Sequence, residues 1–102
     1  NIIYNLEDDF SDLKLYLLAN QDKKVSIAVF ENISQNIAEQ LLAYKNVNLV
    51  KADITEEFVQ NIKNSDEVVV LTSIGKTNSK LYKQIKMMLA EMKKDVAIEA
   101  LV

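Results

Sequence analysis

The residue types best suited to binding a phosphate lie together in the short stretch Ser73 to Thr77, SIGKT. Gly75 is the only glycine of the chain, and with Lys76 and Thr77 it forms the Gly-Lys-Thr ending of a phosphate-binding loop. A full loop, GxxxxGK[ST], needs another glycine at the position of Val70, where backbone N–H groups wrap the β-phosphate. The pattern therefore favours a turn in which Gly75 supplies a backbone angle and Thr77 caps a helix. Gly75, Lys76 and Thr77 stay candidate cofactor-binding residues.

Asp53 is the fourth candidate, because it directly follows an apolar run and could ligate magnesium or accept a phosphoryl group. A receiver domain would also place an acid pair after its first strand, where this chain offers Glu31 alone. Capping of a helix or loop is the other interpretation of Asp53. The hydroxyls of Ser34, Thr72 and Ser73 have no histidine to activate them, since the chain contains none. We assign no catalytic residue, no metal ligand and no cofactor.

The composition is that of one folded domain spanning residues 1–102, with 49% hydrophobic and 26% charged residues. The absence of cysteine excludes disulfides and thiolate metal sites. All 12 cationic residues are lysine, and the absence of arginine argues against nucleic-acid binding. Apolar runs fall far short of the roughly 20 residues of a membrane helix, so we expect a soluble chain. The given sequence begins with Asn1 rather than Met and shows no charged-then-apolar leader, so we expect it to be a segment excised from a larger membrane-associated protein.

Hydrophobic spacing and capping residues alternate helices with strands along the chain. Residues 1–4 form an apolar tail or a short edge strand, and Asn5 is a candidate N-cap for the first helix. Ser34 and Thr55 are candidate N-caps of the next two helices, Asn46 ends the second helix, and Thr77 or Asn78 caps the last. The helices are expected at about 6–20, 35–45, 56–64 and 79–92, and the strands at about 23–30, 47–52, 67–72 and 96–102. Lysines at 76, 80, 83 and, less closely, 86 lie on one side of the last long helix and just before it, and they form either a solvated face or a contact for an acidic partner or anionic lipid headgroups.

The central strand is expected to be covered on both faces, because Val68 to Leu71 is an uninterrupted apolar run. Helices and strands in alternation, joined by short links, predict right-handed crossovers. The predicted fold is a three-layer α/β/α, Rossmann-like domain with about four parallel strands. Ligands of such folds bind beyond the carboxyl ends of the strands, which directs attention to the loops at 31–34, 53–55 and 73–77.

Three stretches resemble the cytoplasmic P-loop domain of bacterial tyrosine autokinases and of the capsular or exopolysaccharide chain-length regulators that they partner. LEDDFSDLK at 6–14 is similar to the opening helix of the family. NLVKADI at 48–54 is similar to the strand that ends in the second nucleotide motif of the family. SDEVVVL at 65–71, together with GKT at 75–77, is similar to the late strand of the family and the turn that follows it. The resemblance implies a reduced P-loop fold.

The departures from the family pattern imply a lost activity. FENISQN at 30–36 stands where the family has its glycine-rich loop and lysine, and Lys51 replaces the first acid of the Asp-x-Asp motif. Phosphoryl transfer needs a phosphate cradle, a metal carboxylate and a positioned acceptor, and all three are missing or replaced.

The resemblance therefore implies a non-catalytic, cytoplasmic domain of a polysaccharide chain-length or export regulator, tethered to the membrane only by flanking segments. Its partner would be a tyrosine kinase of the pathway or further copies of itself. The alternatives are a small phosphate- or nucleotide-dependent enzyme, and a receiver-like or glycosyltransferase-fragment α/β domain.

Overall fold

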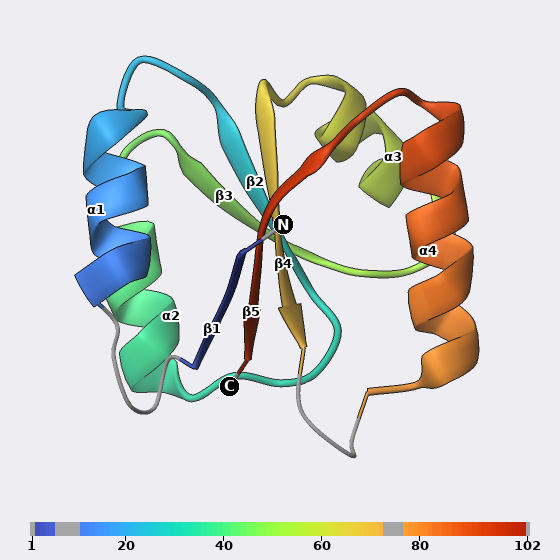
Figure 1. The fold of residues 1–102 in the computed structure, drawn as a ribbon, viewed down its shortest axis with the longest axis horizontal. Coiled ribbons are helices and arrows are strands. Elements are labelled where there is room, and N and C mark those ends of the chain that lie inside the picture. The colour runs from blue at the N-terminus through green and yellow to red at the C-terminus, as the bar shows by residue number, and fades with distance from the viewer. Residues whose placement is uncertain (1, 6–10, 73–76, 102) are drawn as a thin grey trace.

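The computed structural model describes residues 2–5, 11–72 and 77–101, which form one parallel sheet between two helical layers (Figure 1). Strands and helices alternate along the whole described chain. In order they are β1 (Ile2–Asn5), α1 (Ser11–Ala19), β2 (Val25–Val29), α2 (Gln35–Leu42), β3 (Val47–Lys51), α3 (Glu56–Lys63), β4 (Glu67–Thr72), α4 (Ser79–Glu91) and β5 (Val96–Leu101).

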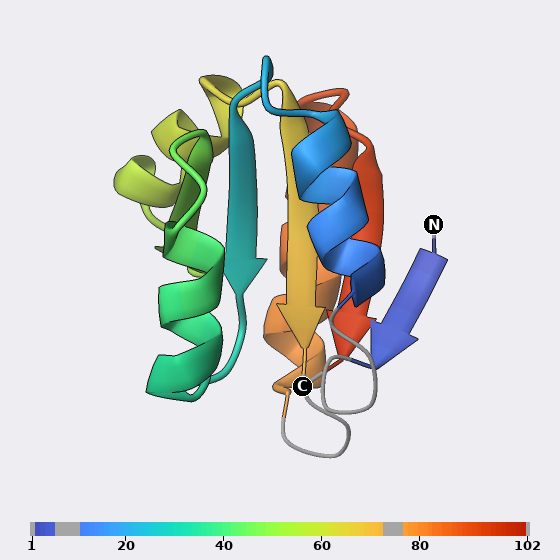
Figure 2. The same ribbon diagram turned by 90° about the vertical axis from the view of Figure 1, so that its left-hand side faces the viewer.

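The five strands lie in the order β1-β5-β4-β2-β3, and every neighbouring pair is parallel. Four of them, β3-β2-β4-β5, follow the 2-1-3-4 order of flavodoxin-like doubly wound sheets, and β1 takes the next position. Helices α1 and α2 cover one face and α3 and α4 cover the other, as Figures 1 and 2 show from two sides. The Rossmann-like α/β/α fold expected from the sequence is confirmed.

Each face of the sheet has its own hydrophobic core. Val69 and Leu71 of β4 pack into the core under α1 and α2, and Val68 and Val70 pack into the core under α3 and α4. All four side chains are fully buried. The continuous apolar run of β4 therefore has the physical cause inferred from the sequence, which is cover on both faces.

The amino-terminal residues confirm one of the two alternatives expected for them, a short edge strand. Ile2–Asn5 is a fifth strand that pairs in parallel with β5, with Ile3 opposite Glu99. Asn5, the candidate helix cap, is the last residue of that strand, because the backbone ladder to β5 extends to it. The described part of the first helix begins at Ser11, and the expected helix residues 6–10 lie outside the described residues.

Among the helices that the structure describes, none is long and apolar enough to cross a bilayer.

Leu41 and Leu42 test the two-layer packing, since they are adjacent residues of α2 with opposite surroundings. Leu41 is 0% exposed and Leu42 is 55% exposed. We expect Leu41→Ala to lower the free energy of unfolding by about 2–5 kcal/mol through the lost burial and the cavity left behind. Leu42→Ala, the matched control, should change it by less than about 0.5 kcal/mol. Urea unfolding of the dilute protein measures both, and equal losses would contradict the assigned orientation of α2.

Candidate functional site

The carboxyl edge of the sheet is where a doubly wound fold places its ligand, at the point where successive crossovers diverge. Here that point lies between β2 and β4, because β2 leads to β3 on one side and β4 leads to β5 on the other. The loop at 30–34 lies on one side of it. On the other side, Thr77 and Asn78 precede α4, whereas Gly75 and Lys76 lie outside the described residues.

Phe30 is the first residue after β2 and it is only 8% exposed. Its backbone N–H donates to the carbonyl of Leu71 at 3.1 Å, which prolongs the pairing of β2 with β4. Its ring packs at a tilt against that of Tyr82, with the centroids 5.6 Å apart. A phosphate cradle needs bare backbone after this strand, which glycine provides. Phe30 instead places an aromatic ring there, packed against α4.

The helices that begin at this edge cap themselves. Ser34 Oγ accepts a hydrogen bond from the backbone N–H of Ile37 at 3.2 Å, and Thr55 Oγ1 accepts one from Phe58 at 3.2 Å. The side-chain oxygen of Asn78 accepts from the N–H groups of Lys80 and Leu81 at 3.0 and 3.2 Å. These side chains engage first-turn N–H groups that a bound phosphate would otherwise use. Ser34 and Thr55 were expected as caps, and at α4 the cap is Asn78, one of two candidates.

Asp53 and Thr77 lie on separate parts of the edge. Asp53 follows the outer strand β3, and Thr77 comes after β4, with β2 between the two strands. Strands two positions apart are separated by roughly 10 Å. The exposed carboxylate of Asp53 accepts a hydrogen bond from the N–H of its neighbour Ile54 at 2.8 Å, as a loop residue does. Within the described ranges, no group of three or more acidic, histidine or cysteine side chains is placed to hold a metal ion.

Two shallow hollows flank the carboxyl half of β3. One, of about 280 Å³, lies toward the loop at 30–33, and the other, of about 250 Å³, lies toward α3. Both are lined by Leu49, Val50 and Lys51. The outer strand therefore has hollowed surface on both sides of its carboxyl half.

Tyr82 of α4 and Glu99 of β5 form a polar pair on the same face of the sheet as Phe30. The Tyr82 hydroxyl donates to a carboxylate oxygen of Glu99, and the ammonium of Lys86 lies 5.7 Å from the centre of the Tyr82 ring. Burial, and then the hydrogen bond to Glu99, raises the pKa of Tyr82 to about 12. The phenol therefore stays protonated near neutral pH and serves as a donor that fastens α4 to β5.

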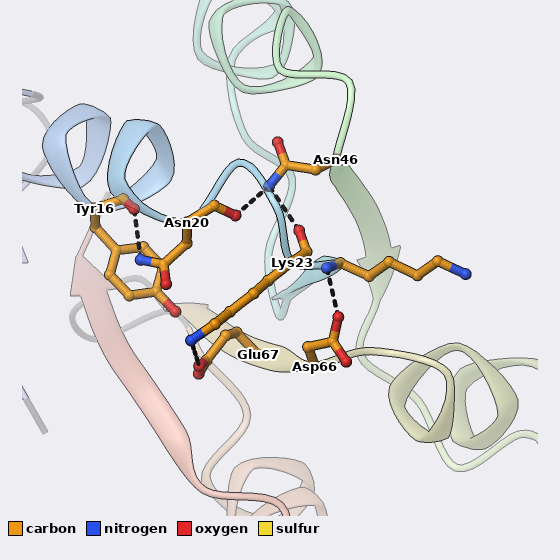
Figure 3. A network of polar contacts seen from close by, with 7 residues as sticks. Tyr16, Asn20, Lys23, Asn46, Asp66 and Glu67 are labelled. Atoms are coloured by element: carbon orange, nitrogen blue, oxygen red, sulfur yellow. Dashed lines mark hydrogen bonds and ion pairs between the residues drawn. The ribbon is translucent and has the colours of Figure 1, made fainter.

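A polar cluster lies at the opposite end of the sheet, where the strands begin (Figure 3). The side-chain amide of Asn46 donates to the carbonyls of Asn20 and Lys23 at 3.0 and 2.8 Å. The ammonium of Lys23 meets the carboxylate of Glu67 at 3.3 Å, and the Asp66 carboxylate accepts from the backbone N–H of Lys24 at 2.9 Å. These contacts connect the turns that precede β2, β3 and β4.

The cluster also contains the buried hydroxyl of Tyr16, which lies near the carboxylate of Glu67. Burial, and then the nearby charge of Glu67, raises the pKa of Tyr16 to about 12. On the other face of the sheet the hydroxyls of Ser26 and Ser65 share a hydrogen bond, and Lys94 Nζ donates to the carbonyl of Ser65 at 2.6 Å. These side chains mostly bond to carbonyls of the turns and to each other. We therefore interpret the polar contacts on both faces as structural, because they hold together the turns from which the strands begin.

No protein-family model matches the chain, and no curated protein or solved structure matches it either. The resemblance to the tyrosine autokinase domain therefore enters below only as a proposal.

Sequence reasoning missed the contacts that cross between elements. Glu99 carried a signal, because it is the one acid in the apolar strand VAIEAL, and such a residue needs a polar partner. Asn46 was interpreted only as a helix end, since an asparagine in a turn does not reveal which carbonyls it reaches. Of the lysines on the last helix, Lys80 and Lys83 are exposed, whereas Lys86 is half-buried beside Tyr82. Met88 and Met92 pack against the core, and Met87 is exposed.

Asn46 and Asn48 provide a matched test of the cluster at the strand starts. Asn46→Ala removes two hydrogen bonds to main-chain carbonyls, so we expect it to lower the free energy of unfolding by about 1–3 kcal/mol. Asn48 makes one exposed bond to the Asn61 side chain at 3.0 Å. Asn48→Ala should cost less than about 1 kcal/mol. Urea unfolding compares them, and a larger loss for Asn48→Ala would show that the cluster does not hold the turns together.

The raised pKa of Tyr82 predicts a pH dependence of stability. Its proton is held more tightly in the folded state, whose pKa is about 12, than in the unfolded state, whose pKa is 10.0. The associated stability is fully present below pH 10 and is lost as the pH rises through 12. We expect Tyr82→Phe to make the loss of stability between pH 10 and 12 less steep. Urea unfolding over this range, with tyrosinate absorbance as a second readout, measures it. An unchanged slope would contradict the assignment.

Proposed function

We propose that this chain is a non-catalytic α/β domain, derived from a P-loop fold, that acts through contacts with other proteins. The observation that carries the proposal is the way in which the loop after β2 packs against α4 and caps α2. Phe30 packs its ring against Tyr82 where a nucleotide-binding fold keeps bare backbone, and Ser34 caps α2 itself. Neither feature provides the wrapped N–H groups that phosphoryl transfer requires.

The placement of Asp53 adds support, because a nucleotide enzyme needs its carboxylate beside the phosphates. Asp53 follows the outer strand and engages its own turn, with β2 between it and the strand that leads to Thr77. A receiver-like domain would likewise need its acids at the point between β2 and β4. The described geometry offers neither alternative a specific advantage.

The sequence resemblance supplies the proposed setting. We propose a cytoplasmic part of a capsule or exopolysaccharide chain-length or export regulator, attached to the membrane through segments outside this chain. Its partner would then be a tyrosine kinase of that pathway or further copies of the domain. This setting rests on the three sequence stretches alone.

A thermal-shift scan with ATP or ADP at 1 mM and excess magnesium tests the absence of nucleotide binding. A ligand bound with a Kd of roughly 10 μM would stabilise the fold by about 2.7 kcal/mol and raise the Tm of a domain this size by about 10 °C or more. We expect a change below about 1 °C. A rise of several degrees that Lys76→Ala abolishes, and that the exposed-lysine control Lys80→Ala leaves intact, would overturn the proposal.

A further inference from the structure

The outer edge of β3 presents backbone hydrogen-bonding groups. Val25 N–H donates to the carbonyl of Asn46, and Ala52 N–H donates to that of Val29, both at 2.9 Å. In a parallel pair, the backbone N–H and C=O groups of alternate residues bond to the neighbouring strand. The backbone groups of residues 46, 48, 50 and 52 therefore point toward β2. The N–H and C=O groups of Val47, Leu49 and Lys51 therefore point away from the sheet. Of these, the Val47 N–H is engaged by the carbonyl of Tyr44 in the preceding turn, at 3.2 Å.

We propose that β3 pairs with β3 of a second copy of this chain, antiparallel about a two-fold axis at Leu49. The proposal names the partner for the protein-contact function proposed above and rests on it. Outward-facing residues must meet one another in such a pair, and centring on Leu49 brings all three into register. Leu49 then faces Leu49 of the partner subunit, and Val47 faces Lys51 of the partner subunit. Four hydrogen bonds form without disturbing the Val47 turn.

Two charged residues just beyond β3, Lys45 in the preceding turn and Asp53 in the following loop, favour this register. The same two-fold axis sets Lys45 opposite Asp53 of the partner subunit, and it does so twice. Both side chains are exposed. A register centred on Asn48 would instead set Lys51 against Lys45, and one centred on Lys51 would set two lysines face to face. Opposite charges across an antiparallel pair stabilise it and like charges destabilise it, so the Leu49 register is the complementary one.

Helix α2 adds an apolar flank beside the same edge. Leu42 is turned about 100° along the helix from the buried Leu41. Because α2 runs antiparallel to the strands in a right-handed crossover, this turn directs Leu42 away from α1 and over the outer side of β3. Ala38, half-buried, precedes Leu42 by one turn on the same flank. The two-fold axis would bring Ala38 and Leu42 of one copy against the same two residues of the partner subunit.

On the face of β3 that is covered by α3, the described side chain of Asn48 does not block the outward backbone groups. It is held against α3 by its hydrogen bond to Asn61. With one hydrogen bond for each 100–200 Å² of interface, four bonds correspond to roughly 400–800 Å². Such an area is below that of a standard interface, so we expect a weak, reversible dimer with a Kd on the order of 100 μM.

A charge swap measured by sedimentation equilibrium, from 10 μM to 1 mM protein at low salt, tests the dimer and its register. Lys45→Glu and Asp53→Lys, each alone, place like charges together at both ends and should weaken association about 5- to 10-fold. The double variant restores both pairs and should return the Kd to within about twofold. Lys83→Glu on the exposed side of α4 is the charge control and should leave it unchanged. Circular dichroism checks that each variant folds.

Amide hydrogen exchange locates the contact independently, because the Leu49 and Lys51 amides should become more protected as concentration rises. A chain that stays monomeric at 1 mM, a double variant that fails to regain association, or protection that falls on residues 2–5 at the other edge would each overturn the β3 pairing. A foreign strand that protects these amides while the chain alone stays monomeric would do the same. Nucleotide binding is measured on the monomer, so failure of this pairing and failure of the proposed function are distinguishable.

Discussion

The burial of β4 on both faces is the constraint on which this fold depends. Its four apolar residues alternate between two cores, and fully burying one such side chain contributes roughly 1.5–3 kcal/mol. That gain requires a helical layer on each side, hence crossovers that leave the sheet in both directions. The divergence of crossovers between β2 and β4 follows directly. The site where such folds bind ligands is therefore a by-product of how β4 is covered.

What the chain does at that site depends on its side chains, and among the described residues these bond to backbone N–H groups of the chain itself. A sequence with one glycine has few positions where backbone can approach a ligand closely. Ser34, Thr55 and Asn78 each engage the first turn of their own helix, and Phe30 joins the core beneath α4. A self-capped edge is more stable than an open one and is less able to bind an anion.

The sequence predicted the features that depend on local pattern and left undetermined those that depend on distant contacts. The β4 run and the caps at Ser34 and Thr55 were visible because a continuous apolar strand and a hydroxyl before an amphipathic run have local causes. For residues 1–4 the sequence left an apolar tail and a short edge strand open, because four residues become a strand only by pairing with β5, at the other end of the chain. Likewise, Tyr82 and Glu99 meet only once α4 is laid across β5. Asp53 and the Gly-Lys-Thr stretch looked like parts of one site, and only the strand order shows β2 between their strands.

A doubly wound sheet covers its faces with helices but has no comparable cover for its outer strands. Natural proteins protect such edges with short strands, bulges, proline or charge. The irregular register in this sheet lies inside it, between β4 and β5, and therefore does not twist β3 away from a partner. β3 has no proline, and its single lysine, Lys51, lies at its carboxyl end. Within the described residues, loop side chains bond inside the chain and some backbone groups of β3 point outward, which is the arrangement on which the proposed strand pairing rests.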